Sequence, residues 1–233
     1  CETAGFSVKG IIKVVRMTRE KQIVIDAINQ KAPLIAGTAD KIWEYAELSL
    51  QEYKSAALYC ETLEKEGFQV QKGIAGIETA FCASFGSGRP VIGILAEYDA
   101  LSGLSQKSGS LKQEEIVAGG NGHGCGHNLL GAGAMAAAIG VKAFMGETKC
   151  PGTVILYGCP GEEGGAAKAF MARDGVWKDL DAALTWHPHD SNEVVTGSSN
   201  SCIQVQYKFM GKASHASGAP EKGRSALDAV ELM

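Results

Sequence analysis

One apolar run, Val91-Ile92-Gly93-Ile94-Leu95-Ala96, constrains the fold more than any other feature of the chain. Its lack of polar alternation is typical of a strand that is buried on both faces of a sheet. Further strands are predicted at Thr153–Tyr157 and Ala182–Trp186, and helical patterns at Leu129–Phe144 and Ala166–Arg173 alternate with them. This alternation predicts an α/β fold with an open mixed sheet and helices on both faces.

The residues before this run add scaffold elements. Helices are predicted from Met17 onward, over Ala39–Leu48 and over Gln51–Lys65. Shorter strand-like patterns follow at Gln69–Val70 and Thr79–Phe85. We expect these elements to complete a first domain that extends to residue 200.

A second domain is predicted to begin at residue 201. Ile203, Val205 and Tyr207 alternate there with polar residues, as in a strand with one face in water. We therefore expect residues 17–200 to form one domain and residues 201–233 to form the start of a smaller α+β domain.

The two ends of the chain lead to two further expectations about the native polypeptide. Residues 1–16 lack an initiating Met and show no amphipathic period, so we expect a leader that is not native. The last helical pattern, Arg224–Met233, reaches the final residue without a stop signal, so we expect the native polypeptide to continue.

Composition excludes several classes of partner. The 233 residues carry a net charge of -4 and no dense stretch of Lys and Arg, which argues against nucleic acid or an anionic membrane as a partner. No apolar run approaches the roughly 18 residues that span a bilayer. The charge thus favours a small-molecule substrate, and the lack of such a run favours a cytoplasmic protein. Seven cysteines, an odd number without a disulfide framework, indicate reduced thiols.

Chemically active side chains follow the predicted strands directly. Glu97 and Asp99 follow the first, Glu162 and Glu163 the second, and His187 the third. Because ligand sites in open α/β sheets form at the carboxyl ends of the strands, we expect these side chains to meet at one edge of the sheet.

A glycine-rich loop, Gly119–Asn128, adds Cys125 and His127 just before the alanine-rich helix. Its alternating glycines permit backbone turns that other residues avoid, so several of its side chains can point the same way. Thiolate, imidazole and carboxylate together suit zinc, with manganese or cobalt as further options. The sequence therefore predicts a metal site.

Three other interpretations compete with this one. A structural zinc site would show closely paired ligands, whereas these are spread over about sixty residues. A serine hydrolase is disfavoured because no Gly-x-Ser-x-Gly turn follows a strand. A cysteine nucleophile, Cys125 paired with His127 or His187, stays open as an alternative.

Four motifs of the chain resemble those of a known family. They are Leu95-Ala96-Glu97-Tyr98-Asp99-Ala100-Leu101, Asn121-Gly122-His123-Gly124-Cys125-Gly126-His127-Asn128, Gly161-Glu162-Glu163-Gly164-Gly165 and Gly211-Lys212-Ala213-Ser214-His215-Ala216. In these motifs and in their order, the chain is similar to the metal-dependent amidohydrolases of the aminoacylase and carboxypeptidase G superfamily, in particular to its branch of aminobenzoyl-glutamate hydrolases and Xaa-Arg dipeptidases. The resemblance begins near Met17 and runs to the end of the chain.

The resemblance implies a zinc-peptidase-like catalytic domain that holds two divalent metal ions, zinc or manganese. Glu162 would be the general base, and Asp99 would orient a metal ligand. Glu97 stands where more distant relatives carry a ligating His, a loss that His127 offsets, and Cys125 stands where they carry a bridging Asp. The implied metal ligands are Cys125, His127, Glu163 and His187.

The resemblance also implies what lies beyond this site. The second domain would be a lid that forms a homodimer or a related heterodimer, and His215 would be the lid histidine that reaches the partner's site. The last metal-binding His of the family would lie downstream, so we expect this chain to be an N-terminal fragment that is inactive alone. Substrates would be dipeptides or N-acyl amino acids, including p-aminobenzoyl-glutamate-like compounds. The alternative is a non-catalytic regulatory or partner subunit with the same fold.

Overall fold

The computed structural model describes residues 17–195, 197–198, 200–203 and 205–233. The described chain divides into two compact units, one that ends at Asp190 and one from Ser191 to Met233. Each unit is described by itself. The predicted leader, residues 1–16, lies outside the described residues, and the division of the chain into domains at residue 200 stays a prediction.

Three helices open the first unit: α1 (Arg19–Gln30), α2 (Ala32–Tyr45) and α3 (Tyr53–Lys65). The side-chain oxygen of Thr18 accepts a hydrogen bond from Lys21 N and caps α1. Pro33 fits the first turn of α2, where a missing N–H costs nothing. This helix therefore begins well before the predicted Ala39 and ends earlier than the predicted Leu48.

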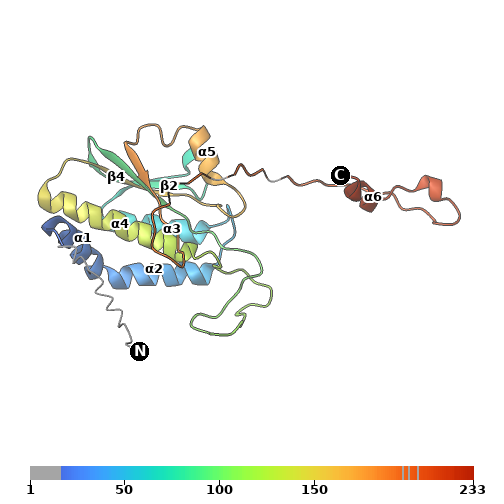
Figure 1. The fold of residues 1–233 in the computed structure, drawn as a ribbon, viewed down its shortest axis with the longest axis horizontal. Coiled ribbons are helices and arrows are strands. Elements are labelled where there is room, and N and C mark those ends of the chain that lie inside the picture. Colours follow the sequence, from blue (N-terminus) through green and yellow to red (C-terminus); the bar gives the residue numbers. More distant parts are fainter. Residues whose placement is uncertain (1–16, 196, 199, 204) are drawn as a thin grey trace, which may run out of the picture. The chain divides into compact units, whose positions relative to one another are not determined.

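Five strands form one open mixed sheet in the order β1-β2-β4-β3-β5 (Figure 1). Strand β1 pairs antiparallel with β2, and β2 with β4, whereas β3 runs parallel to both β4 and β5. The carboxyl ends of β3, β4 and β5 therefore meet at one edge, as the sequence predicted. The bounds are β1 (Gln69–Lys72), β2 (Phe81–Ser87), β3 (Val91–Ala96), β4 (Gly152–Gly158) and β5 (Ala182–Leu184).

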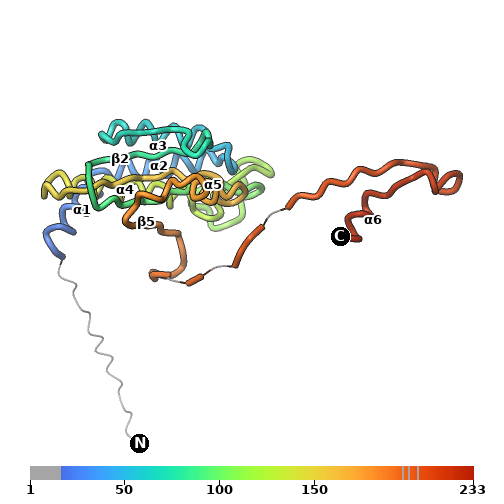
Figure 2. Tube along the Cα trace, turned by 90° about the horizontal axis from the view of Figure 1, so that it is seen from above, coloured from blue at the N-terminus to red at the C-terminus, as the bar shows by residue number. Residues whose placement is uncertain are grey.

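Helices cover both faces of this sheet. On one face, α3 and α4 (His127–Thr148) pack on the strands, and α1 and α2 lie along α4 (Figures 1 and 2). Met135 of α4 and Leu156 of β4 are fully buried in this core. On the other face, Met171 of α5 (Ala167–Arg173) packs near Tyr157. The predicted α/β fold is thus confirmed.

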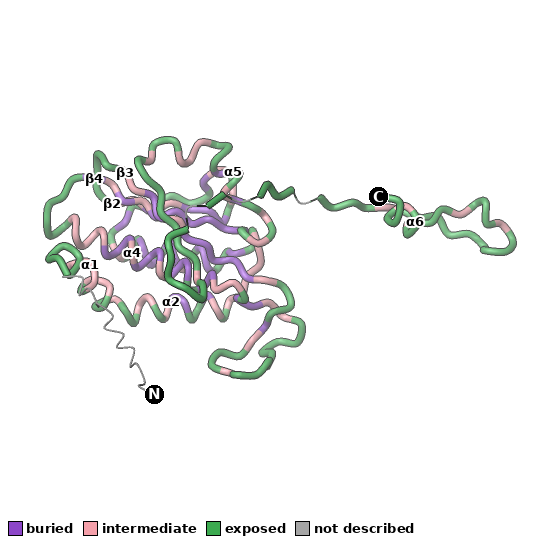
Figure 3. The backbone as a smooth tube through the Cα atoms, in the orientation of Figure 1, coloured by how far each residue is buried: buried purple, intermediate pink, exposed green. Residues whose placement is uncertain are grey.

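Helix α4 is the structural centre of the unit. Figure 3 shows its buried stretches beside those of the strands. Within the described part of the chain, it is the single helix with the length and apolarity of a membrane span, so the expectation that no apolar run approaches that length was wrong. About half of that stretch is buried in the core. Its composition is therefore that of a core helix on a sheet.

The second unit contains little regular structure. A short 3-10 helix, Pro220–Lys222, and α6 (Ala226–Glu231) lie near its end, and Lys212 pairs with Arg224 in an isolated antiparallel bridge. The predicted strand around Val205 is wrong for the described residues 201–203 and 205–211, which form no strand. A strand requires a hydrogen-bonded neighbour, and an alternating pattern alone does not supply one.

Candidate metal centre

Asp99 joins two of the loops that follow the strands. Its side chain is buried, and its Oδ2 accepts hydrogen bonds from Ser49 Oγ at 2.7 Å and from the backbone N–H of Glu163 at 2.9 Å. These bonds, together with the neighbouring His127, outweigh burial and lower the pKa of Asp99. The carboxylate thus fixes the loop after β4 against the loop after β3.

His127 is the first residue of α4, two positions before the predicted helix start. Gly126 precedes it with φ 76°, a left-handed turn that glycine adopts easily. The buried imidazole places Nδ1 2.9 Å from Asp99 Oδ1 and Nε2 3.1 Å from Glu97 Oε2. Burial alone would lower the pKa of His127, but Asp99 and Glu97 raise it to about 10.

Cys125 and His187 also lie close to His127. Cys125 Sγ lies 3.3 Å from His187 Nε2, and the His187 ring stands edge-on to the His127 ring, with centroids 5.6 Å apart. His187 Nδ1 lies 2.9 Å from Pro188 O, so it donates there and leaves Nε2 with its lone pair. Burial, and then the nearby carboxylate of Glu163, raise the pKa of the Cys125 thiol to about 11.

These side chains form two groups that could each hold a cation. The ligand atoms of Cys125, His127 and His187 lie within 4.8 Å of one another, and so do those of Glu97, His127 and Glu162. Among the described residues, Glu163 Oε1 is buried without a hydrogen-bond partner, and Glu97 Oε2 and His127 Nε2, also buried, face one another at 3.1 Å with no further partner. Because unpaired buried polar atoms are costly, the donor set fits divalent cations with nitrogen, sulfur and oxygen ligands.

Glu162 is the more accessible of the two adjacent carboxylates. Its side chain is 42% exposed, and its Oε2 lies 3.9 Å from His127 Nε2. Burial, followed by the negative charge of Glu97, raises the pKa of Glu162. A carboxyl group that reaches solvent and has a raised pKa is suited to take up and return a proton.

The structure brings most of the singled-out residues together: Glu97, Asp99, Cys125, His127, Glu162 and His187. Glu163 joins them through its backbone contact with Asp99 and its inward Oε1. His215 lies in the second unit, where its Nδ1 accepts from Gly218 N at 3.0 Å. Its predicted role at the site stays a prediction.

Sequence reasoning missed two participants. Lys168 of α5 donates from Nζ to Glu97 Oε1, and Ser49 binds Asp99. Both come from segments that the sequence identified as helix and scaffold only. A lysine in the first turn of a short helix carries no pattern that marks it as a site residue.

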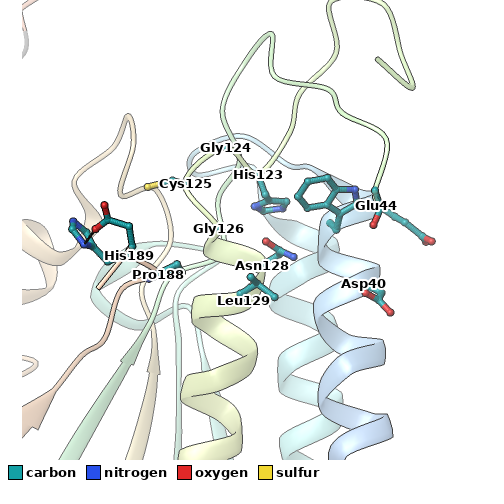
Figure 4. Close-up of a pocket in the computed structure, with 13 residues that line it drawn as sticks. Asp40, Glu44, His123, Gly124, Cys125, Gly126, Asn128, Leu129, Pro188 and His189 are labelled. Carbon is teal, nitrogen blue, oxygen red and sulfur yellow. Dashed lines mark ion pairs between the residues drawn. The ribbon is translucent and has the colours of Figure 1, made fainter. Parts of the chain in front are cut away.

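A cavity of about 860 Å³ opens beside the potential metal ligands, with Cys125 at its wall (Figure 4). Asp40 and Glu44 of α2 line it on the far side from Cys125, and His123 and Asn128 lie between. His123 is buried, and its Nε2 lies 2.9 Å from Ile42 O. Space for a small molecule thus adjoins Cys125.

The fold is that of an α/β protein, and the carboxyl-end edge of its sheet carries a set of potential metal ligands. The chain belongs to Peptidase family M20/M25/M40, whose family model matches residues 93–222. The resemblance that the four motifs indicated is therefore confirmed.

Two curated relatives are similar over most of the chain. One is a subunit of the p-aminobenzoyl-glutamate hydrolase of Escherichia coli K12, which is 48% identical over 212 residues, with 91% of this chain and 44% of that protein covered. The other is the Xaa-Arg dipeptidase of Mus musculus, which is 30% identical over 225 residues, covering 91% and 48%. The chain spans about half the length of these relatives.

Solved structures have the same fold. A dinuclear metal-binding peptidase of the M20 family from Bacillus subtilis matches with a TM-score of 0.53 and 25% identity, covering 72% of this chain and 44% of that one. The aminobenzoyl-glutamate utilization protein from Klebsiella pneumoniae matches with a TM-score of 0.59 and 19% identity, covering 89% and 58%.

Proposed function

We propose that the full-length protein is a metal-dependent amidohydrolase that cleaves the amide bond of a dipeptide or an N-acyl amino acid. The observation that carries this proposal is the shared position of His127, which belongs to both groups of potential ligands. The lone pair of His127 Nε2 can bind one cation only, but groups of potential ligands that adjoin in this way would bring two cations close together, as a two-metal hydrolytic site requires. The hydrolases and dipeptidases among the relatives support the substrate class, with aminobenzoyl-glutamate included.

Each residue has a distinct task in this proposal. Cys125, His127, Glu163 and His187 hold the cations, which we propose to be zinc or manganese, and Asp99 keeps the His127 ring in place. A bound divalent cation polarises the carbonyl and lowers the pKa of water.

Proton transfer is assigned to Glu162. It takes the proton from the attacking water and passes it to the leaving amine, the usual double duty of such a carboxylate. His215 is assigned to the developing oxyanion in the active site of a partner subunit.

We propose assembly through the second domain, as a homodimer or as a heterodimer with a related chain. The E. coli hydrolase has two named subunits that are both similar to this chain, and the more distant one is 25% identical over 256 residues. We also place the protein in the cytoplasm, because the six described cysteines are free thiols.

A second candidate function follows from this pair of E. coli relatives. A chain with this fold could serve as the non-catalytic partner of a related, active chain. Measurements of metal binding and hydrolysis on the full-length protein, purified alone, distinguish the two proposed functions.

The test measures bound metal by mass spectrometry and hydrolysis of a panel that contains aminobenzoyl-glutamate, Xaa-Arg dipeptides and N-acyl amino acids. Turnover that depends on zinc or manganese supports the amidohydrolase. Bound metal without turnover, with activity gained only when a related chain is added, supports the non-catalytic partner. Hydrolysis that survives complete metal removal would contradict the main proposal.

A further inference from the structure

A fully buried carboxylate lies behind the loop that carries Glu162 and Glu163. Glu52, immediately before α3, has no exposed surface. Its Oε1 accepts hydrogen bonds from Leu50 N at 2.9 Å and from Gly161 N at 2.7 Å. Its Oε2 accepts from Thr79 Oγ1 at 3.0 Å. One side chain thus joins three segments of the chain.

The loop after β4 is shaped against the segment before Glu52. Leu50 and Gly161 are both left-handed, with φ 63° and 62°. A Cβ added to Gly161 or to Gly165 would come within 2.9 or 2.8 Å of the Leu50 side chain. Gly165 N donates back to Gly161 O at 2.9 Å, which closes a turn around Glu162 and Glu163. The turn therefore has little room to shift while Leu50 stays in place.

The same segment also reaches the loop after β3. Ser49 binds Asp99 Oδ2, and Ala100 N donates to Glu47 O at 2.8 Å. Residues 47–52 thus contact both loops that supply acidic groups to the site. The hydrogen bond from Gly161 N to Glu52 holds the first residue of the turn that contains Glu162 and Glu163.

We propose that Glu52 is a positioning residue, which anchors the Gly161 turn and thereby sets the direction of Glu162 and Glu163. The inference rests on the proposed function for the roles of those two residues. Glu52 touches none of the reacting groups. Its effect passes through a backbone N–H, so it needs a hydrogen-bond acceptor at this position and does not need a negative charge.

Two variants of the full-length protein distinguish the need for an acceptor from the need for a charge. Glu52→Gln keeps an oxygen for Leu50 N and Gly161 N and offers an amide N–H to the Thr79 hydroxyl. Glu52→Ala removes every acceptor. We expect roughly tenfold to hundredfold weaker zinc binding and faster amide exchange at residues 161–165 in the Ala variant, as for lost partners of metal ligands. The Gln variant should keep zinc affinity within about threefold.

Two matched controls separate positioning from general destabilisation. Thr79→Val removes one partner of Glu52 but leaves Gly161 bound, and Glu47→Gln alters a carboxylate that caps α3 through Lys54 N and Ser55 N. Both should keep zinc affinity within about threefold while lowering the free energy of unfolding. If Glu52→Ala does not fold, Glu52→Asp, which withdraws the acceptor by one carbon, takes its place and should show the same loss.

The kinetic readout is a fall in kcat larger than any rise in KM for Glu52→Ala, because the turn holds Glu162 and not the substrate. The inference would be overturned if Glu52→Ala had the zinc affinity of the wild type and the same rate of amide exchange at residues 161–165. An equal loss in Thr79→Val at matched stability would overturn it as well. Should the wild type hydrolyse no substrate, the proposed function fails, while exchange and zinc binding still decide the role of Glu52.

Discussion

The imidazole of His127 donates from Nδ1 to Asp99 Oδ1 across 2.9 Å, while its Nε2 faces the potential metal-binding groups. A carboxylate that holds the rear nitrogen of a ligating histidine fixes both the tautomer and the ring orientation. The two residues come from different elements, the loop after β3 and the first turn of α4. The core that joins those elements therefore determines where the ligand nitrogen lies.

Asp99→Asn tests this relationship. In one orientation the amide oxygen still accepts from His127 Nδ1–H, but the NH2 group then faces the donors of Ser49 and Glu163. In the other orientation the oxygen accepts from Ser49 and Glu163, and the NH2 group faces His127. We expect roughly tenfold to hundredfold weaker zinc or manganese binding, measured by calorimetry. Ser49→Ala, which removes one of these donors alone, should have a smaller effect. Equal metal affinity in Asp99→Asn and the wild type would contradict the assigned role.

Cys125→Ala distinguishes a metal ligand from a nucleophile. As a ligand, Cys125 contributes to cation affinity, so the variant should lose metal content together with activity. Metal content is measured by mass spectrometry after dialysis against a weak chelator. Full metal stoichiometry with lost activity would instead favour the nucleophile, and alkylation of the metal-loaded wild type should then block turnover.

Glu162→Gln should keep its metal and lose its rate. Glu162 and Glu163 are adjacent, but only Glu163 has an inward oxygen without a hydrogen-bond partner. The rate constant kcat should fall by at least about a hundredfold, the usual contribution of a positioned acid–base group. Glu163→Gln, by contrast, should lose metal first. Wild-type turnover in Glu162→Gln would show that the proton passes elsewhere.

Lys168→Met tests the charge at Glu97. The ammonium of Lys168 neutralises part of a carboxylate that belongs to the Glu97, His127 and Glu162 group. Because like charges repel within a few ångströms, removing it should strengthen cation binding there by roughly tenfold. The matched control is Lys168→Arg, which keeps the charge and should bind as the wild type does. Weaker binding in the Met variant would mean that Lys168 acts by orienting Glu97.

The buried Glu52 should also show in the pH dependence of stability. Burial, partly opposed by its hydrogen bonds, raises its pKa above the ordinary value of 4.5. The unfolded chain therefore ionises first, and the wild type should lose stability relative to Glu52→Gln as pH rises from about 4.5 through the raised value. Denaturant unfolding of both proteins between about pH 4.5 and 8 measures the difference. A difference that is constant over this range would show that Glu52 keeps an ordinary pKa.

The features of the fold that depend on hydrophobic periodicity and on the order of the strands could be predicted from the sequence. The buried strand Val91–Ala96 and the residues after it were identified because parallel strands share one edge, and Glu97, Asp99, Glu162 and His187 indeed approach one another there. Contacts between distant segments were not predictable. Lys168 meets Glu97, and Glu52 meets Gly161, only because tertiary packing brings α5 and the start of α3 to that edge. The prediction of a strand around Val205 was wrong for the opposite reason, since its alternating pattern pairs with no strand among the described residues.

His127 and Cys125, two residues apart, are held in very different ways. His127 begins a helix of 22 residues whose interior is packed in the core, so its ring cannot leave without unwinding the first turn. Cys125 lies on a glycine-flanked loop that has no such support. If Cys125 is a metal ligand, an oxidant that modifies its thiol would remove that one ligand and leave the imidazole and its carboxylate partner in place, and reduction of the thiol would restore the full set.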